Sequence, residues 1–218
     1  MNKMVVAIDG PAGAGKSTVA RLAAQKLDYI YIDTGAMYRA VAWKALQQHQ
    51  TVTDELIISL MPEIEVRLAY QDGKTQVFVD GRDITGEIRT PEVTGIVSQV
   101  AKLAPVREKM VELQRRMAAN GGVIMDGRDI ATHVLPNADV KLFLTASIEE
   151  RAKRRWEEMR QKGYDVDFEE LKKDIAARDK ADSERKISPL VKADDAELLD
   201  TTGLSIDQVV ERILSMCR

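Results

Sequence analysis

Residues 4–18 read MVVAIDGPAGAGKST, and this stretch decides the fold. Its apolar start, residues 4–8, predicts a buried parallel strand, and residues 19–27 after it have good helix propensity. Between them the glycines free the backbone to curl, and GxxxxGKS is the spacing of a phosphate-binding P-loop. In such a loop Lys16 reaches the β- and γ-phosphates and the Ser17 hydroxyl binds Mg²⁺. We therefore expect a nucleoside triphosphate as the first ligand; the alternative is a glycine-rich turn that matches by chance.

The composition limits the class of protein. A chain of 218 residues suffices for one main domain with a smaller lobe. The net charge of −3 gives no global basic field, so we expect no nucleic-acid polymer as a partner. Cys217 is the only cysteine, which is typical of a reducing compartment. No stretch approaches the ~20 apolar residues of a membrane span and no signal peptide is evident, so we expect a cytoplasmic protein.

Short apolar strands alternate with helical stretches along the chain, which predicts an α/β protein of the P-loop NTPase fold. The expected strands of its five-stranded parallel sheet are residues 4–8, 29–33, 123–126, 140–145 and 197–200. The expected helices are residues 19–27, 36–46, 53–61, 92–103, 106–120, 147–162, 168 to about 181, and one that Ser205 caps. We expect these helices to flank the sheet.

The segment from about 62 to 103 changes character. Residues 63–70 and 75–80 alternate between apolar and polar side chains, and the Asp72-Gly73 pair between them is typical of a hairpin turn. Residues 83–85 are expected to add a third short strand. The sequence therefore predicts an inserted lobe with an antiparallel β hairpin.

A second strand-loop-helix unit contains DTGAMYR at residues 33–39. Ligands of α/β proteins bind at the carboxyl ends of the strands, so this unit should lie beside the P-loop. Arg39 is placed to reach a second phosphate, and Thr34 offers a hydroxyl at the helix start. The alternative is that Thr34 is only a helix N-cap and Arg39 only a solvated charge.

The third core strand ends in the same way, with DGRD at residues 126–129. Asp126 is expected to act like a Walker-B carboxylate that orders the Mg²⁺ shell. Arg128 and Asp129 follow at the sheet edge, where they can bind the polar edge of a ligand. The alternative is a turn in which these two residues pair with each other.

Arginines are dense toward the C-terminal third of the chain: Arg151, Arg154, Arg155, Arg160, Arg178 and Arg185. A charged run is usually a solvated helix face, and we expect this for most of residues 149–162. We expect Arg154, Arg178 and Arg185 to belong to a closing lid. Cations there can neutralise a moving phosphoryl group, and one such arginine is worth ~10³–10⁵ in rate.

Six motifs occur in order: GPAGAGKST, DTGAMYR, GEIRT at 86–90, SQV at 98–100 with PVR at 105–107, DGRD, and RDxxDxxR at 178–185. Together they strongly resemble the bacterial cytidylate kinases, a family of the P-loop nucleoside monophosphate kinase superfamily. The resemblance covers essentially the whole chain, and Ser17 stands where some members carry glycine. It implies that the γ-phosphoryl group of Mg²⁺-ATP is transferred to CMP, and also to dCMP, in pyrimidine metabolism.

The resemblance also assigns residues to each ligand. ATP would be bound by Gly10, Pro11, Ala12, Gly13, Ala14, Gly15, Lys16, Ser17 and Thr18. CMP would be bound by Thr34, Arg39, Ser98, Arg107, Arg128, Asp129, Asp182 and Arg185, with the cytosine read chiefly by Ser98, Arg107 and Asp129. The catalytic set would be Lys16, Arg154, Arg178 and Arg185, and Mg²⁺ would be held by Ser17 and Asp126. Cytosine has an amino donor where uracil has a carbonyl, so a carboxylate favours CMP over UMP.

We expect one kinase domain that acts as a monomer. Residues 1–34, 104–150 and 190–218 would form the core, residues 35–103 the monophosphate-binding region with the insert at about 62–103, and residues 151–189 the arginine-rich lid. Three alternatives remain open from the sequence: a kinase for UMP, AMP or shikimate, a nucleotide-binding regulatory switch, and an RNA-binding protein that uses the insert. The guanine-specific NKxD motif of many switches is absent.

Overall fold

The computed structural model describes residues 3–48, 51–71, 74–161 and 163–217. In this part of the chain, five strands form a parallel sheet with the order β2-β6-β1-β7-β8. Its strands are β1 (Val5–Asp9), β2 (Ile30–Asp33), β6 (Val123–Gly127), β7 (Val140–Thr145) and β8 (Glu197–Asp200). The predicted five-stranded parallel sheet is confirmed, and the strand that leads into the P-loop lies at its centre.

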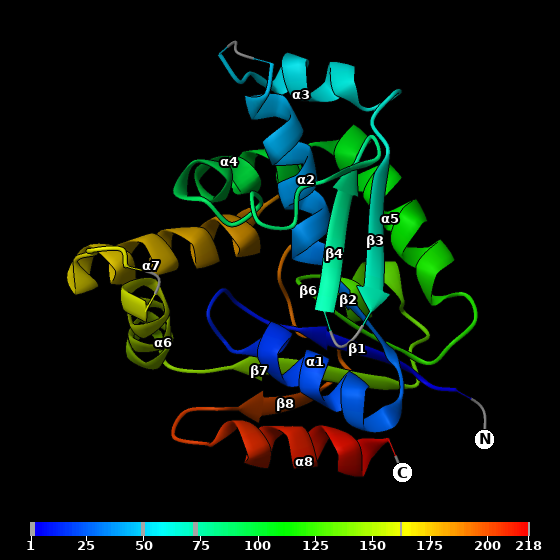
Figure 1. The fold of residues 1–218 in the computed structure, drawn as a ribbon. Helices are drawn as coiled ribbons and strands as arrows, with labels where there is room; N and C mark the ends of the chain where they lie inside the picture. The colour runs from blue at the N-terminus through cyan, green and yellow to red at the C-terminus, as the bar shows by residue number, and fades with distance from the viewer. Residues whose placement is uncertain (1–2, 49–50, 72–73, 162, 218) are drawn as a thin grey trace.

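Helices cover both faces of this sheet (Figure 1). Helices α1 (Lys16–Leu27) and α8 (Ile206–Met216) pack together on one face. Helices α2 (Thr34–Leu46) and α5 (Ala104–Ala118) lie on the other side. Successive residues of β1 point to opposite faces, so Val6 and Ile8 join the core around α1 and α8, whereas Ala7 joins the core that α5 covers.

A second, smaller unit surrounds α2 in Figure 1. It consists of α3 (Asp54–Leu60), α4 (Pro91–Lys102) and an antiparallel sheet of β3 (Val66–Gln71), β4 (Lys74–Val79) and β5 (Arg82–Asp83). In Figure 1, α3 lies above α2, α4 to its left, and β3 and β4 to its right. The antiparallel pairing of β3 with β4 confirms the predicted hairpin, although its turn at 72–73 lies outside the described residues. The third strand ends at Asp83 rather than at Thr85, because the Thr85 hydroxyl donates to Asp83 Oδ1 at 2.6 Å and closes a turn.

Capping side chains fix where most helices begin. Asp33 Oδ1 accepts from Ala36 N at 2.9 Å, so α2 begins at Thr34, two residues earlier than predicted. The side chain of Thr90 caps α4. Ser205 caps α8, as predicted, and it also forms a capping box with Gln208.

Helices α6 (Ile148–Gln161) and α7 (Phe168–Glu184) pack against each other at the side of the sheet (Figure 1). Helix α7 runs three residues beyond its predicted end. A π-helical turn at Ile130–Val134, after β6, was not predicted. Among the residues described, no helix has the length and apolar character needed to cross a membrane.

Candidate functional site at the carboxyl edge of the sheet

The predicted P-loop connects β1 to α1, and its backbone requires glycine at its first position. Gly10 has a φ of +147°, and a Cβ there would lie 1.9 Å from the carbonyl oxygen of Leu144. Lys16 is only 5% exposed, and its Nζ donates to the Pro11 carbonyl at 2.7 Å. Burial, with the nearby charge of Arg128, lowers the pKa of Lys16 to about 7. A bound polyanion would stabilise its charged form.

The oxygens expected to hold Mg²⁺ lie together at the start of α1. Ser17 Oγ donates to Asp126 Oδ2 at 3.1 Å, and Tyr31 Oη donates to Asp126 Oδ1 at 2.7 Å. Burial, with the charge of Asp33, raises the pKa of Asp126 to about 6. No group of three or more His, Cys, Asp or Glu side chains that could hold a metal occurs in the described ranges. The Asp126 carboxylate and the Ser17 hydroxyl fit Mg²⁺ nevertheless, because Mg²⁺ in kinases is bound by only one or two protein carboxylates and takes further oxygens from the substrate phosphates.

At the end of β2, Thr34 is not a helix N-cap and Arg39 is not a solvated charge, so the simple alternative is wrong for both residues. Asp33, not Thr34, is the N-cap of α2, and Thr34 Oγ1 donates instead to the Asp126 carbonyl at 2.7 Å. The Arg39 guanidinium lies over Gly35, where a Cβ would be 2.8 Å from Nη1. Its Nε is buried and has no hydrogen-bond partner among the described residues, so Arg39 is not a solvated charge.

Four arginines lie close enough for their charges to act on one another: Arg39 on α2, Arg128 just after β6, Arg155 on α6 and Arg178 on α7. The charges of Arg128 and Arg178 also act on Lys16 of the P-loop. Burial, together with the charges of Arg128 and Arg39, lowers the pKa of Arg178 to about 9. Burial also lowers the pKa of Arg39, against the effect of Asp33 and together with the charges of Arg128 and Arg155. The Nε of Arg178, like that of Arg39, is buried without a partner in the described structure. This arginine cluster favours an anion as its ligand.

A buried ion-pair group contains three of the eight residues expected to bind the acceptor: Arg107, Asp129 and Arg185. Arg107 Nη2 donates to Asp129 Oδ2, and Arg185 Nη2 lies 3.5 Å from Asp129 Oδ1. Arg107 also donates to the Ala101 carbonyl at 3.3 Å, at the end of α4 and one turn beyond Ser98. Helices α4, α5 and α7 therefore meet at Asp129.

Arg128 and Asp129 do not pair with each other, so that alternative is wrong. Arg128 Nε donates to Asp182 Oδ2 at 2.7 Å, which ties the end of β6 to α7. Asp129 has a φ of −145° and a ψ of 29° just before the π-helical turn, and its side chain pairs with Arg107 instead. Burial alone would raise the pKa of Asp182, but the charge and hydrogen bond of Arg128 lower it.

The surroundings of Arg154 differ from those expected of a lid arginine. Its Nε donates to Glu150 Oε1 at 2.9 Å, its Nη2 to the Thr201 carbonyl at 2.9 Å, and its Nη1 to Thr201 Oγ1 and the Ala14 carbonyl. The side chain supports the P-loop backbone in this structure. Arg155, expected on a solvated helix face, is the α6 arginine whose charge acts on Arg39 and Arg178.

Arg151 is a further residue that sequence reasoning missed. It is 4% exposed, and its Nη1 donates to the Ala12 carbonyl of the P-loop at 2.9 Å. The same nitrogen lies 2.7 Å from Asp179 Oδ2 on α7. The i,i+4 spacing of Arg151 and Arg155 was the available signal, because it puts both on one helix face. Arg151 therefore connects the P-loop to α7.

Substitution of Arg151 by lysine should weaken this connection. A single ammonium group cannot replace the several donors of a guanidinium, so we expect the free energy of unfolding to fall by about 1–3 kcal/mol. Turnover should also fall about tenfold or more, because α7 carries Arg178. Urea unfolding and steady-state kinetics measure both effects. Arg160→Lys, at an exposed position of the same helix, is the control, and equal behaviour of the two variants would contradict the role of Arg151.

Arg89 comes from the GEIRT segment, and no role in the site was predicted for it. Its Nη2 donates to Asp33 Oδ2 at 2.7 Å, and the charge of Asp33 raises its pKa. This ion pair ties the inserted segment to the end of β2.

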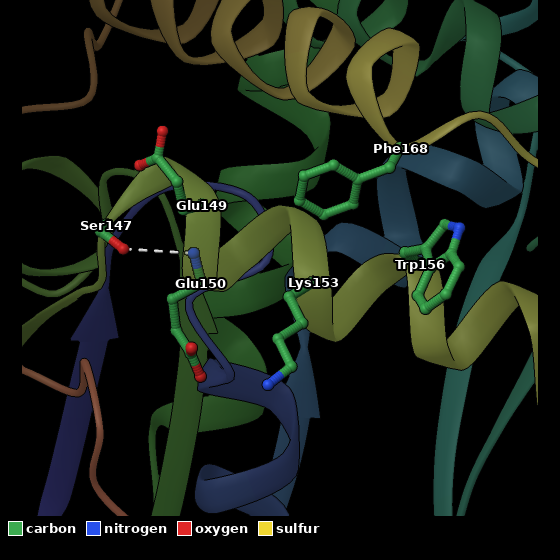
Figure 2. Close-up of a pocket in the computed structure, with 6 residues that line it drawn as sticks. All are labelled: Ser147, Glu149, Glu150, Lys153, Trp156 and Phe168. Carbon is green, nitrogen blue, oxygen red and sulfur yellow. Dashed lines mark hydrogen bonds between the residues drawn. The ribbon is translucent and has the colours of Figure 1, made fainter.

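A cavity of about 500 Å³ opens between α6 and α7. Figure 2 shows its six lining residues: Ser147, Glu149, Glu150, Lys153, Trp156 and Phe168. The rings of Trp156 and Phe168 meet edge to face, with centroids 6.4 Å apart. None of the six lining residues belongs to the arginine cluster, so this cavity is distinct from that cluster.

Comparisons with known proteins identify the family. A family model described as cytidylate kinase matches residues 6–218. The chain belongs to the cytidylate kinase family. It is 55% identical over 213 residues to a cytidylate kinase of Bacillus subtilis, covering 97% of this chain and 95% of the relative. A cytidylate kinase of a Geobacillus species is 56% identical over 216 residues, covering 99% and 96% of the two chains.

This cytidylate kinase family member also resembles solved structures in its fold. A crystal structure of an uncharacterized protein from Eubacterium ventriosum aligns with a TM-score of 0.53 and 14% identity, covering 98% of this chain and 97% of that chain. At that identity the likeness concerns the fold alone. The family assignment makes the chain a nucleoside monophosphate kinase, which is a phosphotransferase.

Proposed function

We propose that this kinase transfers the γ-phosphoryl group of ATP to the α-phosphate of CMP, giving ADP and CDP, and that it also accepts dCMP. The observation that carries the proposal is the arginine cluster beside the P-loop, with two buried Nε atoms that have no protein partner in the described structure. Two nucleotides with adjoining phosphates would supply the missing negative charge. The names of the relatives support CMP as the acceptor.

The chemistry requires positioning and charge neutralisation more than proton transfer. The acceptor phosphate is itself the nucleophile, so we assign no general base. Lys16 and the P-loop N–H groups would hold the donor phosphates, and Arg39, Arg128 and Arg178 would bind the acceptor phosphate and the transferred group. Ser17 and Asp126 would hold Mg²⁺, which when bound neutralises charge on the donor phosphates.

Base recognition is assigned to the group around Asp129. Its carboxylate can accept from the cytosine amino group and would repel the uracil carbonyl. An ionised carboxylate has about four acceptor positions, so Asp129 can keep Arg107 while it binds the base. Ser98, on the adjoining helix α4, would contribute a hydroxyl.

Closure over both nucleotides would keep water from the transferred group. We assign this motion to the region 151–189, which holds most of α6 and all of α7, and to the insert at about 62–103. The core of residues 1–34, 104–150 and 190–218 would stay in place. We further propose that the kinase acts in the cytoplasm as a monomer. Light scattering of the purified protein tests the second point, and a mass of two chains would contradict it.

Acceptor selectivity tests the proposed function directly. ADP formation from Mg²⁺-ATP is measured with CMP, dCMP, UMP, AMP, GMP or shikimate, and without an acceptor. We expect rapid turnover with CMP and dCMP, and a kcat/KM for UMP lower by about 10²-fold or more. Preference for another acceptor would contradict the assignment of Asp129, and hydrolysis that needs no acceptor would favour a regulatory switch.

A further inference from the structure

Asp9 is a buried carboxylate that the proposed mechanism does not use. It is the last residue of β1, immediately before the P-loop glycine, and is 1% exposed. Its Oδ1 accepts from the backbone N–H of Ile130 and its Oδ2 from that of Ala131, both at 2.8 Å. Both oxygens therefore bind one short segment that lies 121 and 122 residues further along the chain.

This segment is the π-helical turn Ile130–Val134, which directly follows Asp129. The first N–H groups of a helical turn have no partner within the turn, and Asp9 supplies two acceptors for them. Arg115 holds the other end, because its Nε donates to the Val134 carbonyl at 2.9 Å and its Nη2 to the His133 carbonyl at 2.8 Å. The turn is thus fixed at both ends by side chains.

The placement of Asp129 depends on this turn. Asp129 immediately precedes Ile130, the first residue whose N–H group donates to Asp9. The orientation of the Asp129 carboxylate is fixed in turn by its contacts with Arg107 and Arg185. A neutral amide in place of Asp9 would keep one acceptor oxygen but would direct an NH₂ group at the second N–H. The segment would then move away, and Asp129 with it.

We propose that Asp9 is a positioning residue for acceptor recognition: from the strand that leads into the P-loop, it fixes the backbone of the turn that directly follows Arg128 and Asp129. The proposal rests on the function proposed above, in which Asp129 reads the base. Asp9 acts on the acceptor half of the site, although β1 also leads into the donor loop.

The chain offers a matched control for the test. Asp139 Oδ2 accepts from Val5 N at 2.7 Å, so it too is a carboxylate bound to backbone, but at the opposite end of β1. We therefore compare Asp9→Asn with Asp139→Asn. For Asp9→Asn we expect the KM for CMP to rise about tenfold or more and the preference for CMP over UMP to fall, with the KM for ATP changed less than about twofold. For Asp139→Asn all three quantities should stay within about twofold of the wild type.

Equal changes of the KM for CMP and ATP in Asp9→Asn, or no change in either, would overturn the proposal, because a merely structural carboxylate would act on both substrates alike. If Asp9→Asn does not fold, Asp9→Glu retains the charge but displaces it by one methylene, and the same CMP-specific shift is expected.

Hydrogen exchange separates this proposal from the proposed function. The backbone amides of Ile130 and Ala131 should exchange faster in the Asp9 variant than in the Asp139 variant, whichever acceptor the enzyme uses. Equal exchange rates of these amides in the two variants would refute the role of Asp9 in holding the turn.

Discussion

Lys16→Met is expected to lower kcat by about 10³-fold or more while the protein remains folded. The ammonium group is the positive charge inside the P-loop, bound to the Pro11 carbonyl and almost wholly buried. Methionine replaces it with an apolar side chain of similar length. Because burial already disfavours the charged lysine, as its lowered pKa shows, the loss of the charge should leave the fold intact.

ADP formation with saturating ATP and CMP measures the catalytic effect, and urea unfolding measures stability. Lys26→Met is the control, because Lys26 lies on the same helix α1 but is exposed and pairs with Glu211 at 2.8 Å. That variant should retain wild-type turnover. If Lys16→Met kept more than about a tenth of the activity, the role of Lys16 in phosphoryl transfer would be refuted.

Elements whose determinants are local were predictable from the sequence. The strand, glycines and helix of residues 4–18 are contiguous, and Ser205 with Gln208 forms a capping box within one turn. The alternation in residues 63–80 predicted β3 and β4 for the same reason. The observed ends of helices and strands differ from the predicted ends by a few residues where a capping side chain or a turn sets the boundary, as at Asp33 and Thr85.

The ion pairs of the site were not predictable, because their partners are distant in sequence. Arg128 and Asp129 are neighbours, and the sequence could not show that one pairs with Asp182 and the other with Arg107. The unpredicted π-helical turn after Asp129 belongs to the same region.

Helix faces in the arginine-rich region posed a related difficulty. Acidic residues three or four positions away make Arg154, Arg155 and Arg160 look like solvated partners of i,i+3 or i,i+4 pairs, and Arg151 lies in the same charged run. Only packing against the P-loop shows that Arg151 is buried and that Arg154 is bound to Thr201.

Asp129→Asn is expected to lower the ratio of kcat/KM for CMP to that for UMP by about 10²-fold or more. The change keeps the shape of the side chain but removes its charge, and the amide NH₂ can donate to the uracil carbonyl that a carboxylate repels. It also leaves Arg107, which is buried, without its full counter-charge, so the free energy of unfolding should fall by about 1–3 kcal/mol.

The ratio separates these two effects. CMP and UMP are assayed with the same fraction of folded enzyme, so a loss of stability lowers both kcat/KM values equally and leaves their ratio unchanged. A change in base recognition alters the ratio. Asp80→Asn is the matched control, since Asp80 also pairs with a cation, Lys44 at 2.8 Å, but lies in the inserted lobe at the start of the β4–β5 turn. Its ratio should stay within about twofold of the wild type. An unchanged ratio in Asp129→Asn would leave Asp129 as a structural partner of Arg107 and move base recognition to Ser98 and Arg107.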